Sequence, residues 1–266
     1  MDNIPQFSYK NLASKPEFNF SCKFTTQESI GDNNLNTYDD SLYANINIGC
    51  KYMDETTFCN EYSRTNKFSF LSLNVQSLNA KFTDLQETID NFILNKCSPD
   101  VLLLQEIWQI QNVNTFSLNS YSMLNFKTRS NNVQGGGVGI FFKNGLRYNI
   151  LPELSIFIDR VIETIFAELW ITKNKKVIIA SIYRPSVNHP TLNSSEQYHQ
   201  FMELFANTLN NFLESKTPVY LFGDFNLDVL RYNTINQVTD YVDLLFSHGF
   251  LQIVCILRVV PPTQRL

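Results

Sequence analysis

The residues best suited to chemistry in this sequence stand at 223–226, where Gly-Asp-Phe-Asn follows an apolar run. The run predicts a buried strand, and a strand that ends in this way brings a carboxylate and an amide to the rim of a sheet. The carboxylate of Asp224 could orient or deprotonate a water molecule, and the amide of Asn226 could donate to a phosphate oxygen. Both residue types are also common in turns, so either could be a turn residue without a catalytic role.

Further predicted strand ends carry polar residues that an apolar core would not hold. Asn74 ends one apolar segment, and Glu106 follows another, where it suits a hard cation such as Mg²⁺. Tyr183 and Arg184 end a third, as candidate phosphate contacts. Taken singly, Asn74 could be a strand cap, Glu106 a surface residue and Arg184 an edge residue. Their occurrence at successive strand ends, together with Asp224, indicates phosphodiester chemistry at a sheet edge.

The elements that must position these residues follow from apolar periodicity. Strands are predicted at 68–75, 101–104, 138–142, 150–151, 161–171, 176–183 and 218–222. Helices are predicted at 80–96, 194–213 and 237–247, with Ser194 or Ser195 as the cap of the second. Several strands follow one another without a helix between them. The pattern therefore predicts an α/β fold with mixed or antiparallel sheets rather than a doubly wound parallel sheet.

The segment between residues 106 and 153 holds no acidic residue and four basic ones. These are Lys127, Arg129, Lys143 and Arg147. Their charge could face a polyanion such as DNA, with Lys127 and Arg129 as phosphate contacts; alternatively, they are solvated strand ends that are close only in sequence. A run of three glycines at 135–137 fits neither a P-loop nor a dinucleotide fingerprint, because a strand follows it.

Length and composition allow one large domain with an extension: the chain has 266 residues, of which 44% are hydrophobic. The first 66 residues hold nine acidic and five basic residues, which accounts for the whole net charge of −4. They predict a disordered acidic leader before a domain at 67–266. Five scattered cysteines predict reduced thiols. No secretory signal or membrane-spanning run is visible, so we expect a nuclear or cytoplasmic protein, not secreted and without a membrane partner.

Five short segments occur in the order found in a known superfamily. They are 72–78 (SLNVQSL), 100–108 (DVLLLQEIW), 136–140 (GGVGI), 182–185 (IYRP) and 223–226 (GDFN). From about residue 67 to residue 253 the chain resembles the endonuclease/exonuclease/phosphatase superfamily. More narrowly, it resembles the apurinic/apyrimidinic-type endonuclease domain of non-LTR retrotransposons. The resemblance implies a DNase I-like fold, a four-layer α/β sandwich of two packed mixed or antiparallel sheets flanked by helices.

The resemblance also implies an activity and site residues. The family nicks DNA with Mg²⁺ (or Mn²⁺) and frees a 3′-hydroxyl for reverse transcription. DNA is then the expected partner, with the element's RNA and reverse transcriptase as further partners in a longer polyprotein. Glu106 corresponds to the metal ligand and Asn74 to its neighbour at the metal. Asp224 corresponds to the residue that aligns or activates water, and Asn226 to the one that holds the phosphate.

The sequence departs from the family pattern in several places. Asn74-Val75-Gln76 lacks the second carboxylate of an Asn-x-Asp motif, and Gly135 stands near the place of a tyrosine. No Asp-His motif closes the sequence. We therefore expect a domain that is incomplete at its C-terminus and lacks the last strand and the catalytic histidine. Three alternatives stay open: an active endonuclease, a catalytically dead truncated remnant that at most binds nucleic acid, and a phosphatase of the same superfamily.

Overall fold

The computed structural model describes residues 8–9, 51–52, 59–60, 68–129, 134–186 and 189–251. Most of the predicted leader, residues 1–66, lies outside the described residues. Within it, β1 (Ser8–Tyr9) pairs in parallel with β2 (Lys51–Tyr52). Residues 252–266, the last part of the predicted domain, also lie outside the described residues.

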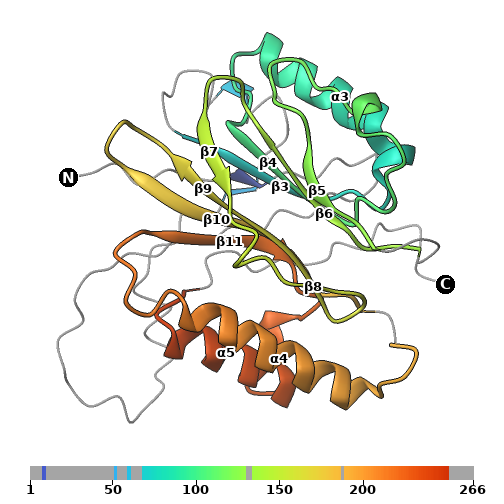
Figure 1. Cartoon of the computed structure of the whole chain (residues 1–266), viewed down its shortest axis with the longest axis vertical. Coiled ribbons are helices and arrows are strands. Elements are labelled where there is room, and N and C mark those ends of the chain that lie inside the picture. The colour runs from blue at the N-terminus through green and yellow to red at the C-terminus, as the bar shows by residue number, and fades with distance from the viewer. Residues whose placement is uncertain are drawn as a thin grey trace.

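The domain has four layers, with two sheets packed face to face between helices, which confirms the predicted fold class (Figure 1). Helix α3 (Leu78–Leu94) covers one sheet, and helices α4 (Ser194–Asn210) and α5 (Asn236–Ser247) cover the other. The first sheet consists, in spatial order, of β3 (Phe70–Asn74), β4 (Val101–Gln105), β6 (Val138–Phe142) and β5 (Asn125–Lys127). The second consists of β11 (Val219–Asp224), β10 (Lys176–Tyr183), β9 (Ile162–Trp170) and β7 (Arg147–Ile150), with β8 (Phe157–Ile158) also paired to β9. Short 3₁₀ helices are η1 (Val113–Thr115) and η2 (Val229–Arg231).

Each sheet contains one parallel pair, and the remaining pairs are antiparallel. Strands β3 and β4 run parallel and are joined through α3, while β10 and β11 run parallel and are joined through α4. Parallel strands end at the same edge of a sheet. Asn74 is therefore level with Gln105, and Tyr183 is level with Asp224. This topology gathers the polar strand ends that the sequence singled out.

Strand β4 is apolar on both faces because it lies between two separate cores. Leu102 and Leu104 belong to the core under α3, whereas Val101 and Leu103 belong to the core between the sheets. All four residues are fully buried. A strand in this position reads as a continuous apolar run, as the sequence predicted.

One buried amide at the end of β4 connects the two sheets. Gln105, only 1% exposed, donates from Nε2 to Ser181 Oγ on β10 at 2.9 Å. Its Oε1 accepts from Ser72 Oγ on β3 at 3.3 Å, and Ser181 Oγ donates to the carbonyl of Leu104 at 2.9 Å. The strand end that precedes Glu106 is thus fixed against both sheets.

Some element ends differ from the predictions for local reasons. The predicted cap of α4, Ser194 or Ser195, is wrong: Asn193 is the cap, and its Oδ1 accepts from the N–H groups of Ser195 and Glu196 at 3.0 Å. The Glu196 side chain accepts in return from Asn193 N–H, which completes a capping box. Strands β5 and β8 were not predicted, because two or three residues carry no periodicity. None of the described helices combines the length and apolar character needed to cross a membrane.

Candidate active site

Asn74, at the carboxyl end of β3, joins two carboxylates that come from different sheets. Its Nδ2 donates to Glu106 Oε1 and to Asp224 Oδ2, both at 2.7 Å. Its Oδ1 accepts from Gln76 N–H at 3.2 Å, which is consistent with the amide nitrogen facing the carboxylates. Asn74 is buried, while Glu106 and Asp224 are partly exposed. The two carboxylates are therefore held side by side at a solvent-accessible edge.

Glu106 sits on a constrained backbone directly after β4. Its φ is 52°, in the left-handed region that costs a residue with a side chain on the order of 1 kcal/mol or more. The conformation is held because the Glu106 carbonyl accepts from Ser77 N–H at 2.8 Å, and the Ile107 carbonyl accepts from Leu78 N–H at 3.0 Å. The start of α3 therefore fixes the direction of the Glu106 side chain.

Asp224 and Asn226 form a tight turn at the end of β11. Asp224 Oδ1 accepts from Asn226 N–H at 2.9 Å, and Asn226 has φ 48°. Asn226 Nδ2 donates to the carbonyl of Arg184 at 2.7 Å, and Arg184 N–H donates to the carbonyl of Asp224 at 2.8 Å. The turn expected of these residue types is real, and it also aims Asp224 at Asn74.

The Arg184 side chain lies between this turn and helix α4 and does not point into solvent. Its Nη1 donates to the carbonyls of Phe225 at 3.0 Å and Asn226 at 3.3 Å. Its guanidinium lies over the rings of Tyr198 and Phe201, 5.5 and 5.2 Å from their centres. Burial lowers the pKa of Arg184. The geometry thus assigns this side chain to positioning the turn, and its predicted contact with phosphate would be indirect.

Tyr183 stands beside Glu106 and level with Asp224. Burial raises the pKa of its phenol, and the neighbouring Glu106 carboxylate, which shares a hydrogen bond with it, raises the pKa further. Tyr183 is 4% exposed. It therefore stays protonated and donates to Glu106.

Arg129, predicted as a DNA contact, is buried and paired inside the protein. Its Nε lies 2.5 Å from Glu163 Oε1 on β9, and the two side chains are 2% and 0% exposed. Its Nη1 donates to the carbonyl of Gln134 at 3.1 Å. Burial raises the pKa of Glu163, and the positive charge of Arg129 opposes that rise. A phosphate contact of Arg129 at the surface does not fit this burial.

The three-glycine turn closes over this ion pair. A Cβ at Gly136 would lie 2.4 Å from Arg129 Nε and 2.4 Å from Glu163 Oε2, so the close approach requires glycine. Gly137 N–H donates to Glu163 Oε2, and the Gly136 carbonyl accepts from Trp108 N–H at 2.8 Å. The buried pair therefore supports the loop that follows β4.

The other basic residues of the same stretch have separate partners. Lys127 Nζ donates to a carbonyl in the loop before β8 at 3.4 Å. Lys143 lies 3.9 Å from an oxygen of Asp100, and the guanidinium of Arg147 stacks 4.1 Å from the ring centre of Trp170. These partners lie on different elements, which favours the interpretation that the basic residues are close only in sequence.

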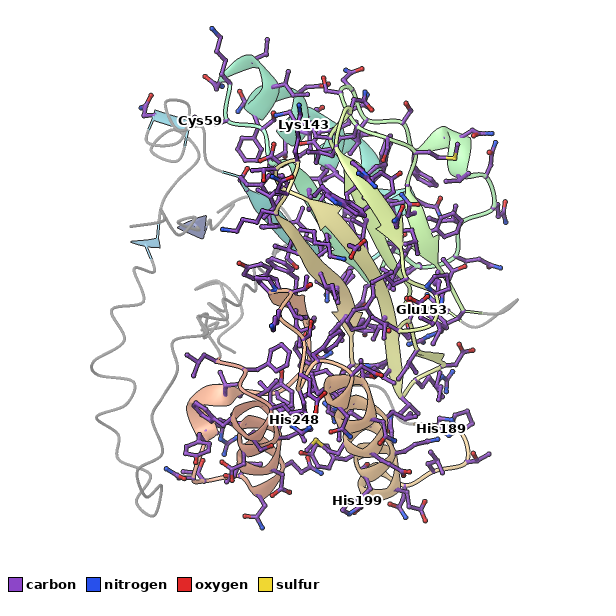
Figure 2. All side chains as sticks on the ribbon, turned by 60° about the vertical axis from the view of Figure 1, so that its left-hand side comes forward. Cys59, Lys143, Glu153, His189, His199 and His248 are labelled. Atoms are coloured by element: carbon purple, nitrogen blue, oxygen red, sulfur yellow. The ribbon has the colours of Figure 1, made fainter. Side chains whose placement is uncertain are left out.

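The histidines lie on the side of α4 and α5, away from the end of the molecule that carries Lys143 (Figure 2). His248 Nε2 is 3.0 Å from Asn210 Oδ1 at the end of α4, and His189 bonds to Thr191. His199 is an exposed residue of α4. Asn74, Glu106, Asp224 and Asn226 are called the Asn74 cluster below. Within the part of the chain that the structure describes, no hydrogen bond connects a histidine to the Asn74 cluster.

The donor set of the cluster fits a hard cation. Among the described residues no three side chains of His, Cys, Asp or Glu converge. Mg²⁺ nevertheless binds proteins through one or two carboxylates and completes its shell with water. Glu106 and Asp224 offer such oxygens. The amide nitrogen of Asn74 faces them, so Asn74 orients the ligands. This fits its predicted place beside the metal ligand, and a direct bond to the ion would require its oxygen to turn toward the ion.

Sequence reasoning missed Glu163 as part of this arrangement. A signal was present, because an acidic residue inside the apolar run 161–167 must find a buried partner. No spacing identifies that partner, since Arg129 is 34 residues away in the chain.

Comparisons place the chain among known proteins. The model of the Endonuclease/Exonuclease/phosphatase family matches residues 71–264, a range that contains every residue of the Asn74 cluster. No curated protein matches the sequence.

Several solved structures are similar. TDP2 from D. rerio, complexed with single strand DNA product, has 20% sequence identity to this chain and a TM-score of 0.43. The match covers 64% of this chain and 65% of the TDP2 chain, so this chain spans less than two thirds of that TDP2 chain. The endonuclease domain of TRAS1, a telomere-specific non-LTR retrotransposon, has 12% identity and a TM-score of 0.46 over 69% of this chain and 71% of its own. The 3′ phosphatase NExo from Neisseria, bound to product DNA hairpin, has 15% identity and a TM-score of 0.45 over 68% and 71%.

Proposed function

Since the chain belongs to the endonuclease/exonuclease/phosphatase family, we propose that it hydrolyses phosphodiester bonds of DNA with a bound divalent cation, Mg²⁺ or Mn²⁺. One observation carries the proposal: Asn74 donates to Glu106 and to Asp224 at 2.7 Å each. These bonds hold the Glu106 carboxylate, which is suited to bind a cation, beside the Asp224 carboxylate, which is suited to bind a water molecule. Hydrolysis of a phosphate diester needs both groups at one point.

Glu106 would hold the cation, and Tyr183 would keep the Glu106 carboxylate oriented through its protonated hydroxyl. When bound, the cation polarises the phosphate and stabilises the negative charge that develops on it. The left-handed backbone at Glu106 and the bonds from the start of α3 fix the ligand before substrate arrives. A fixed ligand suits Mg²⁺, which demands a near-ideal geometry.

Asp224 would align the attacking water and take its proton. Its two oxygens each accept one bond, from Asn74 and from Asn226 N–H, and a carboxylate has lone pairs for more. The water oxygen forms a bond to phosphorus, the bond from phosphorus to the 3′ oxygen breaks, and the 3′ oxygen takes a proton from solvent. Asn226 Nδ2 gives one N–H to Arg184 and has a second for a phosphate oxygen.

The narrower role that we infer is target nicking for a non-LTR retrotransposon. Of the two products above, a 3′-hydroxyl and a 5′-phosphate, the 3′-hydroxyl is the group that primes reverse transcription. The order of the five segments from 72–78 to 223–226 supports this role. The element's RNA and reverse transcriptase would be the further partners.

Conversion of supercoiled plasmid to the nicked circle tests the proposal. We expect nicking with Mg²⁺, loss of nicking in Glu106→Ala, and retention in Glu153→Ala, which removes an exposed carboxylate of the loop after β7 (Figure 2). Extension of the nick by a DNA polymerase without further processing would identify the 3′-hydroxyl.

Other outcomes would support the alternative functions. The protein would be a phosphatase rather than an endonuclease if it left the plasmid intact and hydrolysed a phosphomonoester, and if Glu106→Ala abolished that hydrolysis. DNA binding without hydrolysis of either substrate, in protein shown to be folded, would leave a nucleic-acid-binding remnant.

A further inference from the structure

A polar cleft lies directly beside the turn that carries Glu106. Its volume is about 540 Å³, within the range of sites for small ligands. Five of its lining residues are carboxamides, namely Asn79, Gln109, Gln111, Asn112 and Gln134. Trp108 adds an indole ring, and none of the described residues that line the cleft is charged.

This composition favours a nucleobase over a phosphate as ligand. A carboxamide donates and accepts at once, as the edges of the bases do, and Asn and Gln side chains pair with adenine in this way. An indole provides a surface on which a base stacks. Sites for the phosphate backbone depend on Lys and Arg instead, and these are missing from the described lining.

The walls of the cleft are fixed by hydrogen bonds of the loop that follows Glu106. Trp108 follows Glu106 by two residues, has φ 61°, and donates its N–H to the carbonyl of Gly136 at 2.8 Å. Asn79, at the start of α3, donates from Nδ2 to the carbonyl of Gln109 at 2.8 Å. A base bound here would therefore belong to a nucleotide close to the phosphate at Glu106.

Trp108 supplies a second, independent observation. Its indole Nε1 is buried and has no hydrogen-bond partner in the part of the chain that the structure describes. A buried donor without a partner is unfavourable, and most such donors in proteins are satisfied. A base carbonyl in the cleft would satisfy it once the indole turned its N–H toward the cleft.

We propose that the cleft between the start of α3 and the loop after β4 binds an unpaired nucleobase next to the cleaved phosphodiester bond. The inference rests on the proposed function in one respect: it takes the substrate to be a polynucleotide. It adds that one base is drawn out of the stack and that carboxamides hold its edge, so unpaired DNA near the nick is preferred over continuous duplex.

Tryptophan fluorescence can test base binding without catalysis. The chain has two tryptophans, Trp108 in the cleft and Trp170 under Arg147. The probe is a short single-stranded oligodeoxynucleotide, titrated in EDTA so that no bond is cleaved, beside an oligonucleotide of the same length made only of abasic sites. We expect the base-containing probe to quench Trp108 and to bind about tenfold more tightly, the effect of roughly one stacked base. Trp108→Phe should remove the quenching, because the remaining fluorescence then comes from Trp170, which does not line the cleft.

Gln111→Leu keeps the experiment decisive if Trp108→Phe does not fold. Gln111 is exposed, so its replacement should leave the fold intact while weakening the base-containing probe toward the abasic one. Equal binding of both probes, or unchanged binding in Gln111→Leu, would overturn the proposal. If deoxyadenosine monophosphate quenches the Trp108 fluorescence as strongly as the oligonucleotide does, the cleft binds the base of a free nucleotide as well. If the protein nicks plasmid but binds both probes equally, only this inference is refuted. If it binds the base-containing probe more tightly but does not nick plasmid, only the proposed function is refuted.

Discussion

Replacing Arg129 by methionine should destabilise the protein by about 3–5 kcal/mol, because it leaves Glu163 buried without its counter-charge. The Nε and Oε1 atoms are 2.5 Å apart, and the side chains are 2% and 0% exposed. Water therefore cannot replace the lost partner. Methionine retains the length of the apolar stem, so the loss reports the charge more than a cavity.

Lys176→Met is the matched control. Lys176 Nζ lies 2.5 Å from Glu168 Oε1, the same distance as in the buried pair, but the side chains are 48% and 17% exposed. Solvent screens such a pair, and its removal should cost only about 0–1 kcal/mol. The two pairs thus have the same N···O distance and differ in their burial.

The assay is urea unfolding followed by circular dichroism, with the free energy of unfolding taken for each variant. The double variant Arg129→Met with Glu163→Gln should regain at least about 1.5 kcal/mol, because no buried charge is left. Burial raises the pKa of Glu163, and loss of Arg129 raises it further. The folded variant then holds the proton more tightly than the folded wild type does. The deficit is therefore small below the pKa of Glu163 in the wild type, which burial has already raised, and it grows as the pH rises from there to the higher pKa in the variant.

Two results would refute this reasoning. Equal losses in Arg129→Met and Lys176→Met would show that burial does not set the cost. A loss that is independent of pH and persists in the double variant would show that packing, not charge, is responsible.

Three further changes test other parts of the fold. Asn74→Ala should lower the rate of plasmid nicking about 10²–10³-fold, because two carboxylates lose their shared donor; an unchanged rate would contradict its role. Gly223→Ala should lower the free energy of unfolding by more than about 3 kcal/mol, since a Cβ would lie 2.0 Å from the carbonyl oxygen of Ile182 and force β10 from β11. An unaltered urea midpoint would contradict that clash. Diamide should link the buried thiols Cys59 and Cys97, whose Sγ atoms are 3.0 Å apart, as a cross-linked peptide seen by non-reducing mass spectrometry and absent from Cys97→Ser.

Elements with a clear pattern were predictable, because apolar periodicity reports burial directly. The strand predicted at 176–183 is observed with the same bounds, and the run 101–104 gave a strand buried on both faces. The site was predictable as a set of strand ends. Its contacts were not, because Asn74 and Asp224 are 150 residues apart and only the packing of two sheets brings them together. Arg129 shows the limit: its charge is visible in the sequence, but its burial against Glu163 is not.

The amide of Gln105 has a consequence for where the chemistry is located. Residues 101–104 are apolar on both faces, so a shift of β4 by one residue would still present apolar side chains to both cores. Gln105 is the polar residue of that strand, and both ends of its amide are bonded, one to each sheet. A slipped strand would place this amide in an apolar core and a leucine among hydroxyl groups. The two hydrogen bonds of Gln105 thus fix the register of β4. Although Gln105 is uncharged and takes no part in hydrolysis, this register makes Glu106 the first residue beyond the edge of the sheet.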